Sequence, residues 1–377
     1  MLVIATVCGD PGGANALVPV LSLLESEPSV HLENYSYNEG EVILSRNGFD
    51  FTALSDRADE NIAIDYLKKT EASILLTATS LNAVNWERSF FRAAKNLSVR
   101  SMAILDFWSG YRERFAESTE IELVIPDLLA VMDDRASTEA IRAGLPGSNI
   151  VITGQPAFDA LSECRRLFDS VTELQLRDNI EAKADELIVL FVSQPLREMA
   201  SSHGLSGQGF DEFLVVREVL TALERIAQDT GFKIALVLRL HPREAIDSYD
   251  WLESQHIRIL ISIDGNSRDL VMCADLVVGM NSVLLLEACH LGCVVVSVQP
   301  DMTGSDMLPT NRHGASHAVY KVDSIRQSLE EHLLNTSVRD SMLSRNKSLS
   351  ADDGAAQRIA ALILNNLNLA GITSQDC

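Results

Sequence analysis

The chain has 377 residues, which is long for one hydrophobic core and fits two domains of ordinary size. Its 53 acidic residues outnumber its 31 basic ones, and the net charge of -22 opposes binding to nucleic acids and to anionic membranes, so we expect neither as a partner. Hydrophobic residues at 46% and charged residues at 22% are globular values, which excludes a disordered or collagen-like chain.

The N-terminal sequence MLVIATVCGD predicts a first β-strand rather than a signal peptide. No basic segment precedes its apolar run, and no small-residue cleavage site follows it. No apolar run in the chain approaches the ~18 residues of a membrane-spanning helix. We therefore expect a cytoplasmic protein without a transmembrane segment.

Apolar runs alternate with amphipathic segments along the first half of the chain. The expected strands are LVIATVC, VHLENYSY, SILLTA and VRSMAILD, and the expected helices cover about 14–25, 59–69 and 84–96. Continuous apolar strands are buried on both faces, as in a parallel sheet wound with helices. Residues 1–155 therefore predict a Rossmann-like domain.

The second half repeats this alternation after the segment GLPGSNIVITGQPAFDAL. Its expected strands are ELIVLFVSQ, FKIALVLRLHP, HIRILISI, ADLVVGM and CVVVSVQP. We expect a second Rossmann-like domain over residues 156–350, and a C-terminal helix within 351–377 that packs back towards the first domain. The predicted fold class is α/β, with two doubly wound parallel sheets facing across a cleft. Ligands of such sheets bind where the strands end, so polar residues that follow a strand are the candidate site residues.

Two candidate segments in the first domain follow the first strand and the strand SILLTA. Asp10, Gly12 and Gly13 form a tight turn, which either only caps the next helix or lets the backbone approach an acceptor. Thr79 and Ser80 likewise either cap the following helix or face the acceptor.

The segment AILDFWSGYRERF supplies a third candidate, with Asp106 at a strand end followed by Trp108 and Arg112. A carboxyl group beside aromatic side chains can have a raised pKa that suits proton transfer near neutral pH. The alternative is a structural ion pair of Asp106 with Arg112 or Arg114.

In the second domain, Ser193 and Gln194 follow the first strand and His241 follows the second. Arg239 and Arg243 flank His241. In so acidic a chain, this grouping favours an anion site over a lone structural histidine.

The segment GMNSVLLLEACHLG begins a helix at Asn281, Ser282 and Val283. The N–H groups and the dipole at a helix start form a phosphate site. Glu287 lies in the second turn, where its carboxylate suits the vicinal hydroxyls of a ribose.

The polar segment 301–317 follows the last expected strand. Its Thr310 and Asn311 either reach the sugar of a ligand or belong to a surface loop without function.

These segments together resemble the GT-B glycosyltransferases and their relatives, lipid A disaccharide synthase and the UDP-N-acetylglucosamine 2-epimerases. VITGQPAFDAL, RLHPRE and GMNSVLLLEACHLGCVVVSVQP are similar to the interdomain segment, the HP strand end and the glutamate-bearing helix of that superfamily. LDFWSGYRERF is similar to a segment of bacterial surface-polysaccharide proteins. The resemblance implies that the second domain binds a nucleotide. Ser193 and Gln194 would form the first donor loop, and His241 would lie near the base or the phosphate. Asn281 and Ser282 would form the phosphate turn, and Glu287 would bind the ribose.

The sequence therefore favours a GT-B glycosyltransferase of surface-polysaccharide or glycolipid synthesis, acting with inversion and without a metal or cofactor. Its donor would be a UDP- or CMP-linked sugar, and its acceptor a carbohydrate or glycolipid. Asp106, or else Asp10, would remove the acceptor proton. His241, Arg243 and the helix start at Ser282 would hold the departing diphosphate.

Two alternatives stay open. One is a hydrolysing UDP-N-acetylglucosamine 2-epimerase, although the TERPE-like loop of the epimerases is replaced here by PTNRHG. The other is a nucleotide-sugar-binding protein without catalysis. The sequence is compatible with a homodimer.

Overall fold

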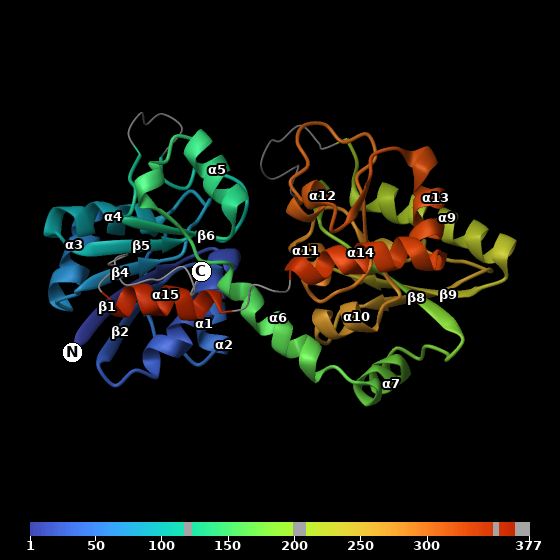
Figure 1. Ribbon diagram of the computed structural model, residues 1–377, viewed down its shortest axis with the longest axis horizontal. Helices are drawn as coiled ribbons and strands as arrows, with labels where there is room; N and C mark the ends of the chain where they lie inside the picture. Colours follow the sequence, from blue (N-terminus) through green and yellow to red (C-terminus); the bar gives the residue numbers. More distant parts are fainter. Residues whose placement is uncertain (117–122, 199–208, 350–353, 366–377) are drawn as a thin grey trace. The chain divides into compact units, whose positions relative to one another are not determined.

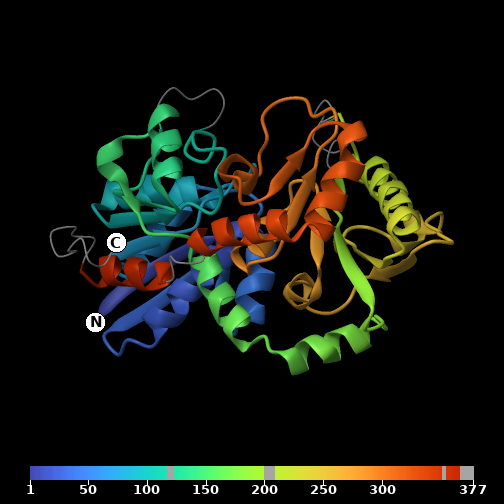
Figure 2. The same ribbon diagram turned by 45° about the vertical axis from the view of Figure 1, so that its right-hand side comes forward.

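The structure, a computed structural model, describes residues 1–116, 123–198, 209–349 and 354–365 (Figures 1 and 2). Its contacts divide the chain into two compact units. Unit 1 combines Met1–Ala160 with Asp352–Cys377, and unit 2 is Leu161–Ala351. Each unit holds one wholly parallel sheet covered by helices, so the predicted class of two wound α/β sheets is confirmed.

Unit 1 contains a seven-stranded sheet in the order β3-β2-β1-β4-β5-β6-β7. Its central strands are nearly all buried and rich in Ile, Leu, Val and Ala, as expected of strands with helices on both faces. The strands are β1 (Leu2–Cys8), β2 (Val30–Ser36), β3 (Thr52–Ala53), β4 (Ile74–Thr77), β5 (Arg100–Ile104), β6 (Leu128–Val131) and β7 (Ile150–Ile152).

The helices of unit 1 lie on both faces of this sheet (Figure 1). They are α1 (Pro11–Glu25), α2 (Glu39–Arg46), α3 (Glu60–Lys69), α4 (Trp86–Leu97), α5 (Asp134–Arg142) and α15 (Ala355–Leu364), and α6 (Pro156–Leu167) leads out of the unit. Both views show α15 beside α1, where Ile359 and Ile363 are fully buried. The carboxylate of Asp159 accepts hydrogen bonds from the first N–H groups of α15, which fixes the start of this helix.

Unit 2 contains a six-stranded sheet in the order β10-β9-β8-β11-β12-β13. Its strands are β8 (Glu186–Val192), β9 (Lys233–Arg239), β10 (Arg258–Ser262), β11 (Leu276–Gly279), β12 (Val295–Val298) and β13 (His317–Val319). Its helices are α7 (Ser170–Asn179), α9 (Glu212–Thr230), α10 (Ser267–Cys273), α11 (Val283–His290), α12 (Pro309–His313), α13 (Ile325–Leu334) and α14 (Thr336–Leu349). One core joins β8, β9, β11 and β12 to α9 and α13.

The strand order reverses once in each sheet. In unit 1 the chain builds β1, β2 and β3 in one direction and then crosses to β4 on the other side of β1. In unit 2 it builds β8, β9 and β10 and then crosses to β11 on the other side of β8. Ligands of open α/β sheets bind at such switch points, beyond the carboxyl ends of the strands. The loops after β1, β4, β8 and β11 are therefore the first places to look for a site.

Every strand expected from the sequence is present, with ends shifted by a few residues. The sequence analysis did not predict the strands β3, β6, β7 and β13 or the helices α2 and α5. Within the described residues, no helix is both long enough and apolar enough to cross a lipid bilayer.

Candidate functional site

Two loops of unit 2 meet across its switch point. Oε1 of Gln194, after β8, accepts a hydrogen bond from the backbone N–H of Asn281, after β11, at 3.0 Å. Ser282 is the N-cap of α11, and its hydroxyl accepts the N–H of Leu284 at 3.1 Å. Val283, the first residue of α11, is 49% exposed. The positive end of the α11 dipole therefore lies at the accessible carboxyl edge of the sheet.

Glu287 lies in the second turn of α11 and is paired with Arg268. Nε and Nη2 of Arg268 donate to the two carboxylate oxygens at 2.9 and 3.0 Å, a bidentate pair that fixes the carboxylate plane. The side chain of Glu287 is 15% exposed, so the pair is not sealed from a ligand. The ribose role of Glu287 stays a prediction. Arg268 was not identified from the sequence, because nothing local relates α10 to α11.

Glu244 joins the ends of β8 and β9. Its Oε1 accepts from the hydroxyls of Ser193 at 2.7 Å and Tyr249 at 2.5 Å, and its Oε2 accepts from the N–H of His241 at 2.7 Å. Burial lowers the pKa of His241, and the positive charge of Arg243 lowers it further. His241 is therefore neutral at pH 7 and offers a hydrogen bond rather than a charge.

The two arginines of the predicted anion site, Arg239 and Arg243, have different surroundings. Arg239 donates through Nη1 to Oγ of Ser262 at 3.0 Å and through Nη2 to the carbonyl of Gly265 at 2.9 Å, so its guanidinium holds the loop after β10. Arg243 is half-exposed, and its Nη1 lies 4.0 Å from a carboxylate oxygen of Glu198. The role of these cations in binding an anion stays a prediction.

Thr310 and Asn311 lie in the short helix α12, next to Asp306. Nδ2 of Asn311 donates to Oδ2 of Asp306 at 2.7 Å, and Oγ of Ser316 donates to Thr310 and Asn311 at 2.8 and 2.5 Å. Thr310 is only 1% exposed, which leaves Asn311 as the more accessible of the two predicted sugar contacts.

Asp106, after β5 in unit 1, forms a buried ion pair with Arg114. Its Oδ1 accepts from Nη1 of Arg114 at 2.5 Å and from the hydroxyl of Thr79 at 2.8 Å. The side chains of Arg114 and Asp106 are 3% and 11% exposed. Of the two arginines considered from the sequence, Arg114 is thus the partner of Asp106 in this pair. Whether Asp106 accepts a proton stays a prediction.

The glycines after β1 allow close packing at this edge. A Cβ at Gly12 would lie 2.5 Å from Oδ2 of Asp106, and one at Gly13 would lie 2.7 Å from Cβ of Ala78. The start of α1 therefore lies so close to Asp106 that a side chain larger than that of glycine would not fit at position 12 without a shift.

Asp10 joins the loops after β1 and β4 across the switch point of unit 1. Its Oδ2 accepts from the N–H of Leu81 at 2.7 Å, and its Oδ1 accepts from Nδ2 of Asn82 at 2.6 Å. Although Asp10 is at the N-cap position of α1, its carboxylate makes no capping hydrogen bond. The interpretation of Asp10 as a residue that only caps α1 is therefore wrong.

Thr79 and Ser80 do not cap α4 either. Asn85 is its N-cap, and Oδ1 of Asn85 accepts the N–H of Arg88 at 3.1 Å. Thr79 donates to Asp106, as above, and Ser80 donates to Oε1 of Glu87 at 2.6 Å. The two hydroxyls therefore belong to the carboxylate cluster at the sheet edge.

Glu87 is a buried carboxyl group that the sequence analysis did not include in the site. It is 1% exposed, and the hydroxyl of Tyr37 donates to its Oε2 at 2.6 Å. Burial raises the pKa of Glu87 to about 7, although its hydrogen bonds act in the opposite direction. Tyr37, the last residue of VHLENYSY, directly follows β2. Polar residues that follow a strand were the candidate site residues, so Tyr37 could have been included from the sequence, and its partner Glu87 could not.

Trp108 lies close to Asp106 in the sequence but bonds to a different carboxylate. Nε1 of Trp108 donates to Oδ2 of Asp133 at 2.7 Å, and its ring stacks on Phe158. Trp108 is 6% exposed, so most of its surface packs inside unit 1. The acceptor-side roles predicted for Trp108 and Arg112 stay predictions.

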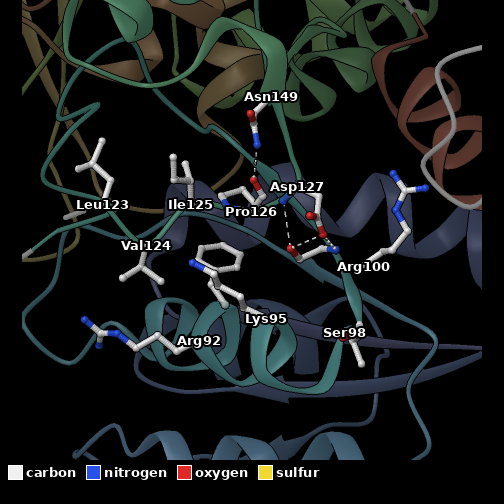
Figure 3. Close-up of a pocket in the computed structure, with 13 residues that line it drawn as sticks. Arg92, Lys95, Ser98, Arg100, Leu123, Val124, Ile125, Pro126, Asp127 and Asn149 are labelled. Atoms are coloured by element: carbon white, nitrogen blue, oxygen red, sulfur yellow. Dashed lines mark hydrogen bonds between the residues drawn. The ribbon is translucent and has the colours of Figure 1, made fainter.

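A cavity of about 890 Å³ lies at the opposite edge of the unit 1 sheet, where β5 and β6 begin (Figure 3). Arg92, Lys95 and Arg100 are among the residues that line it, as are Ser101 and Asp127, which are hydrogen-bonded to each other. Arg92 and Arg100 both make interactions within the chain. Because strand carboxyl ends carry the ligands of such sheets, we do not assign the site to this cavity.

Comparison with solved structures identifies the fold. S. aureus MnaA in complex with UDP matches with a TM-score of 0.70 at 15% identity, over 99% of both chains. The UDP-N-acetylglucosamine 2-epimerase from Neisseria meningitidis, bound to UDP-N-acetylglucosamine, matches with a TM-score of 0.68 at 14% identity, over 97% of this chain and all of the other. The chain has the GT-B-like fold.

A third GT-B-like structure, Anabaena Alr3699/HepE in complex with UDP and glucose, matches with a TM-score of 0.63 at 12% identity, over 97% of this chain and 99% of that chain. No protein-family model and no curated protein matches the sequence. The predicted resemblance to the UDP-N-acetylglucosamine 2-epimerases is thus confirmed for the fold.

Proposed function

We propose that the protein is an enzyme that processes a nucleotide sugar, and that unit 2 binds the nucleotide. The observation that carries this proposal is the pairing of loops at both switch points: Gln194 with Asn281 in unit 2, and Asp10 with Leu81 and Asn82 in unit 1. Ligands of wound sheets bind at such points. The start of α11 suits a diphosphate, and Glu287 suits the ribose hydroxyls.

We assign the reaction to the 2-epimerase class. Two of the similar structures cited above, the N. meningitidis epimerase and S. aureus MnaA, contain UDP-N-acetylglucosamine and UDP. Epimerisation at C2 requires a base that removes the C2 hydrogen while the C1–O bond to UDP breaks, so that the electron pair forms a C1=C2 double bond, and then an acid that returns a hydrogen to the other face of C2 while UDP or water adds to C1. Asp106 and Asp10 lie near the switch point of unit 1 and retain some exposed surface, and we propose them as these groups.

Glycosyl transfer to a carbohydrate or glycolipid is the second candidate, and one observation favours it. The TERPE-like loop of the epimerases is replaced by PTNRHG, and Thr310 in that segment is buried. In that reaction Asp106 or Asp10 would instead remove a proton from the acceptor hydroxyl.

The test is incubation with UDP-N-acetylglucosamine alone in D2O, followed by proton NMR. The epimerase proposal predicts loss of the C2 proton signal and formation of the C2 epimer, at a rate that Asp106→Asn lowers by about 100-fold or more. Release of UDP only when an acceptor is added, without deuterium at C2, would favour transfer. Binding without turnover under either condition would favour a non-catalytic protein.

A further inference from the structure

The buried carboxyl of Glu87 is linked to Asp10 by two routes. In the first, Tyr37 donates its hydroxyl to Oε2 of Glu87 at 2.6 Å. Nδ2 of Asn82 then donates both to the Tyr37 oxygen at 3.2 Å and to Oδ1 of Asp10 at 2.6 Å. In the second, Ser80 donates to Oε1 of Glu87 at 2.6 Å and accepts from the N–H of Asp10 at 3.4 Å. Each hydroxyl that donates to Glu87 therefore has a second link: Tyr37 contacts Asn82, which is bonded to Asp10, and Ser80 contacts Asp10 itself.

Further hydrogen bonds of Asn82 and Asn85 hold the loop that carries the partners of Asp10. Oδ1 of Asn82 accepts the N–H groups of Val84 and Asn85 at 3.0 and 2.9 Å. Nδ2 of Asn85 donates to the carbonyl of Ser80 at 2.9 Å. Asn82, which with Leu81 holds both oxygens of Asp10, is thus bound on one side to Tyr37, a partner of Glu87, and on the other to the start of α4, the helix that carries Glu87.

We propose that Glu87 is a positioning residue that holds Asp10 through Ser80, Tyr37 and Asn82, and that ionisation of Glu87 changes how firmly these hydrogen bonds hold Asp10. The acid–base role of Asp10 rests on the proposed function, whereas the coupling between the two carboxyl groups does not. Hydrogen bonds in a buried network transmit charge more strongly than the same contacts in water.

The surroundings of Glu87 favour such coupling. The titratable groups that exchange charge effects with it are Asp10 after β1, Cys8 at the end of β1, and Tyr37 after β2. The negative charge of Asp10 raises the pKa of Glu87, in addition to the effect of burial. The charges on the two carboxyl groups therefore interact.

The experiment is a carboxyl 13C NMR titration of the full-length protein, with the Asp10 signal assigned by its loss in Asp10→Asn. We expect the wild-type Asp10 signal to shift near pH 7 together with the Glu87 signal, because Glu87 ionises there. In Glu87→Gln this shift of the Asp10 signal near pH 7 should disappear.

Two further variants keep the test decisive. Tyr37→Phe removes a donor to the Glu87 carboxylate but leaves the bonds from Leu81 and Asn82 to Asp10, so the change near pH 7 should move to higher pH. Asp127→Asn removes a carboxylate at the opposite edge of the same sheet and should leave the Asp10 signal unchanged. An Asp10 signal with the same pH dependence in wild type, Glu87→Gln and Tyr37→Phe would overturn the inference. If Glu87→Gln fails to fold, the same pH dependence in wild type and Tyr37→Phe would overturn it.

The proposed function is separated from this inference by measuring C2 exchange in the same variants. If the Asp10 titration responds to Glu87 while no nucleotide sugar is turned over, the coupling stands and the proposed function fails. If turnover occurs, Glu87→Gln should shift the pH dependence of kcat and leave KM for the nucleotide sugar unchanged, because the nucleotide contacts lie on unit 2. A pH profile of kcat that Glu87→Gln leaves unaltered would contradict the positioning role.

Discussion

Tyr37 donates its hydroxyl to Oε2 of Glu87 at 2.6 Å, although fifty residues separate them in the sequence. This bond lies beneath the switch point of unit 1, next to the loop that holds Asp10. A carboxyl group that is 1% exposed and has a pKa of about 7 is costly to ionise, and carboxyl groups with such shifted pKa values cluster at functional sites.

The stability of unit 1 should therefore depend on pH through Glu87. Its folded-state pKa of about 7 lies above the ordinary value of 4.5, so its stabilising contribution is complete below pH 4.5 and is lost as the pH rises through 7. Glu87→Gln mimics the neutral form and should raise the free energy of unfolding at pH 8 by up to roughly 3 kcal/mol relative to wild type. Urea unfolding of both proteins at pH 5 and pH 8 measures this, and an equal difference at the two pH values would refute it.

Glu287 should matter for nucleotide affinity more than for folding. Glu287→Gln removes the charged acceptor proposed for the ribose hydroxyls and should weaken UDP binding by roughly 1 to 3 kcal/mol in calorimetric titration. Arg268→Ala should weaken it less, because the carboxylate would remain but lose its bidentate partner.

A matched ion pair in the same unit supplies the control for Glu287. Arg258 also contacts both carboxylate oxygens of Glu186, but this pair lies at the amino end of β8. Glu186→Gln should lower stability without changing the affinity for UDP. If Glu287→Gln and Glu186→Gln bind UDP equally well, the ribose assignment is wrong.

Gly12→Ala should separate catalysis from nucleotide binding. The added Cβ would lie 2.5 Å from Oδ2 of Asp106, so the carboxylate or the start of α1 must move. We expect kcat to fall at least tenfold, because small displacements of a catalytic group are costly, while UDP affinity stays unchanged. Gly147→Ala, whose Cβ would meet only the side chain of Ile141 at 3.3 Å, is the control. Normal kcat in Gly12→Ala would argue against a catalytic Asp106.

Unit 2 should lose stability in acid because of His317 and His332. Their rings stack with centroids 4.4 Å apart, and burial lowers the pKa of each below 6.5. Since the folded state favours the neutral rings, their contribution is complete above pH 6.5 and is lost as the pH falls below that value. His317→Phe keeps an aromatic ring without the charge, so its melting temperature should fall less than that of wild type between pH 7 and pH 5. Parallel curves for the two proteins would exclude this pair as a cause of acid sensitivity.

The sequence predicted the strands within long apolar runs well, and it missed the short edge strands β3, β7 and β13 together with β6, although β6 is buried. LVIATVC and ELIVLFVSQ are long apolar runs, and burial on both faces leaves such runs little choice of structure. β3 has two exposed residues, and β13 has three residues of which only Val319 is buried, so these strands exist because a neighbouring strand pairs with them and not because of their own pattern. Local periodicity carries no information about such pairing.

The candidate site was predictable where a polar residue follows a strand. Asp10, Ser80, Gln194 and Ser282 were found in this way, and the structure does join their loops across the two switch points. The partners that hold the site residues were not predictable, because Arg268 and Glu87 lie within helices and reach their partners only after the chain has folded.

A crystal structure of the protein soaked with UDP is the most direct measurement of the central claim. The account predicts a diphosphate against the N–H groups at the start of α11, beside Ser282, and a ribose within hydrogen-bond distance of Glu287. UDP bound elsewhere, or a soaked crystal with an empty α11 start under conditions where calorimetry shows saturation, would contradict it.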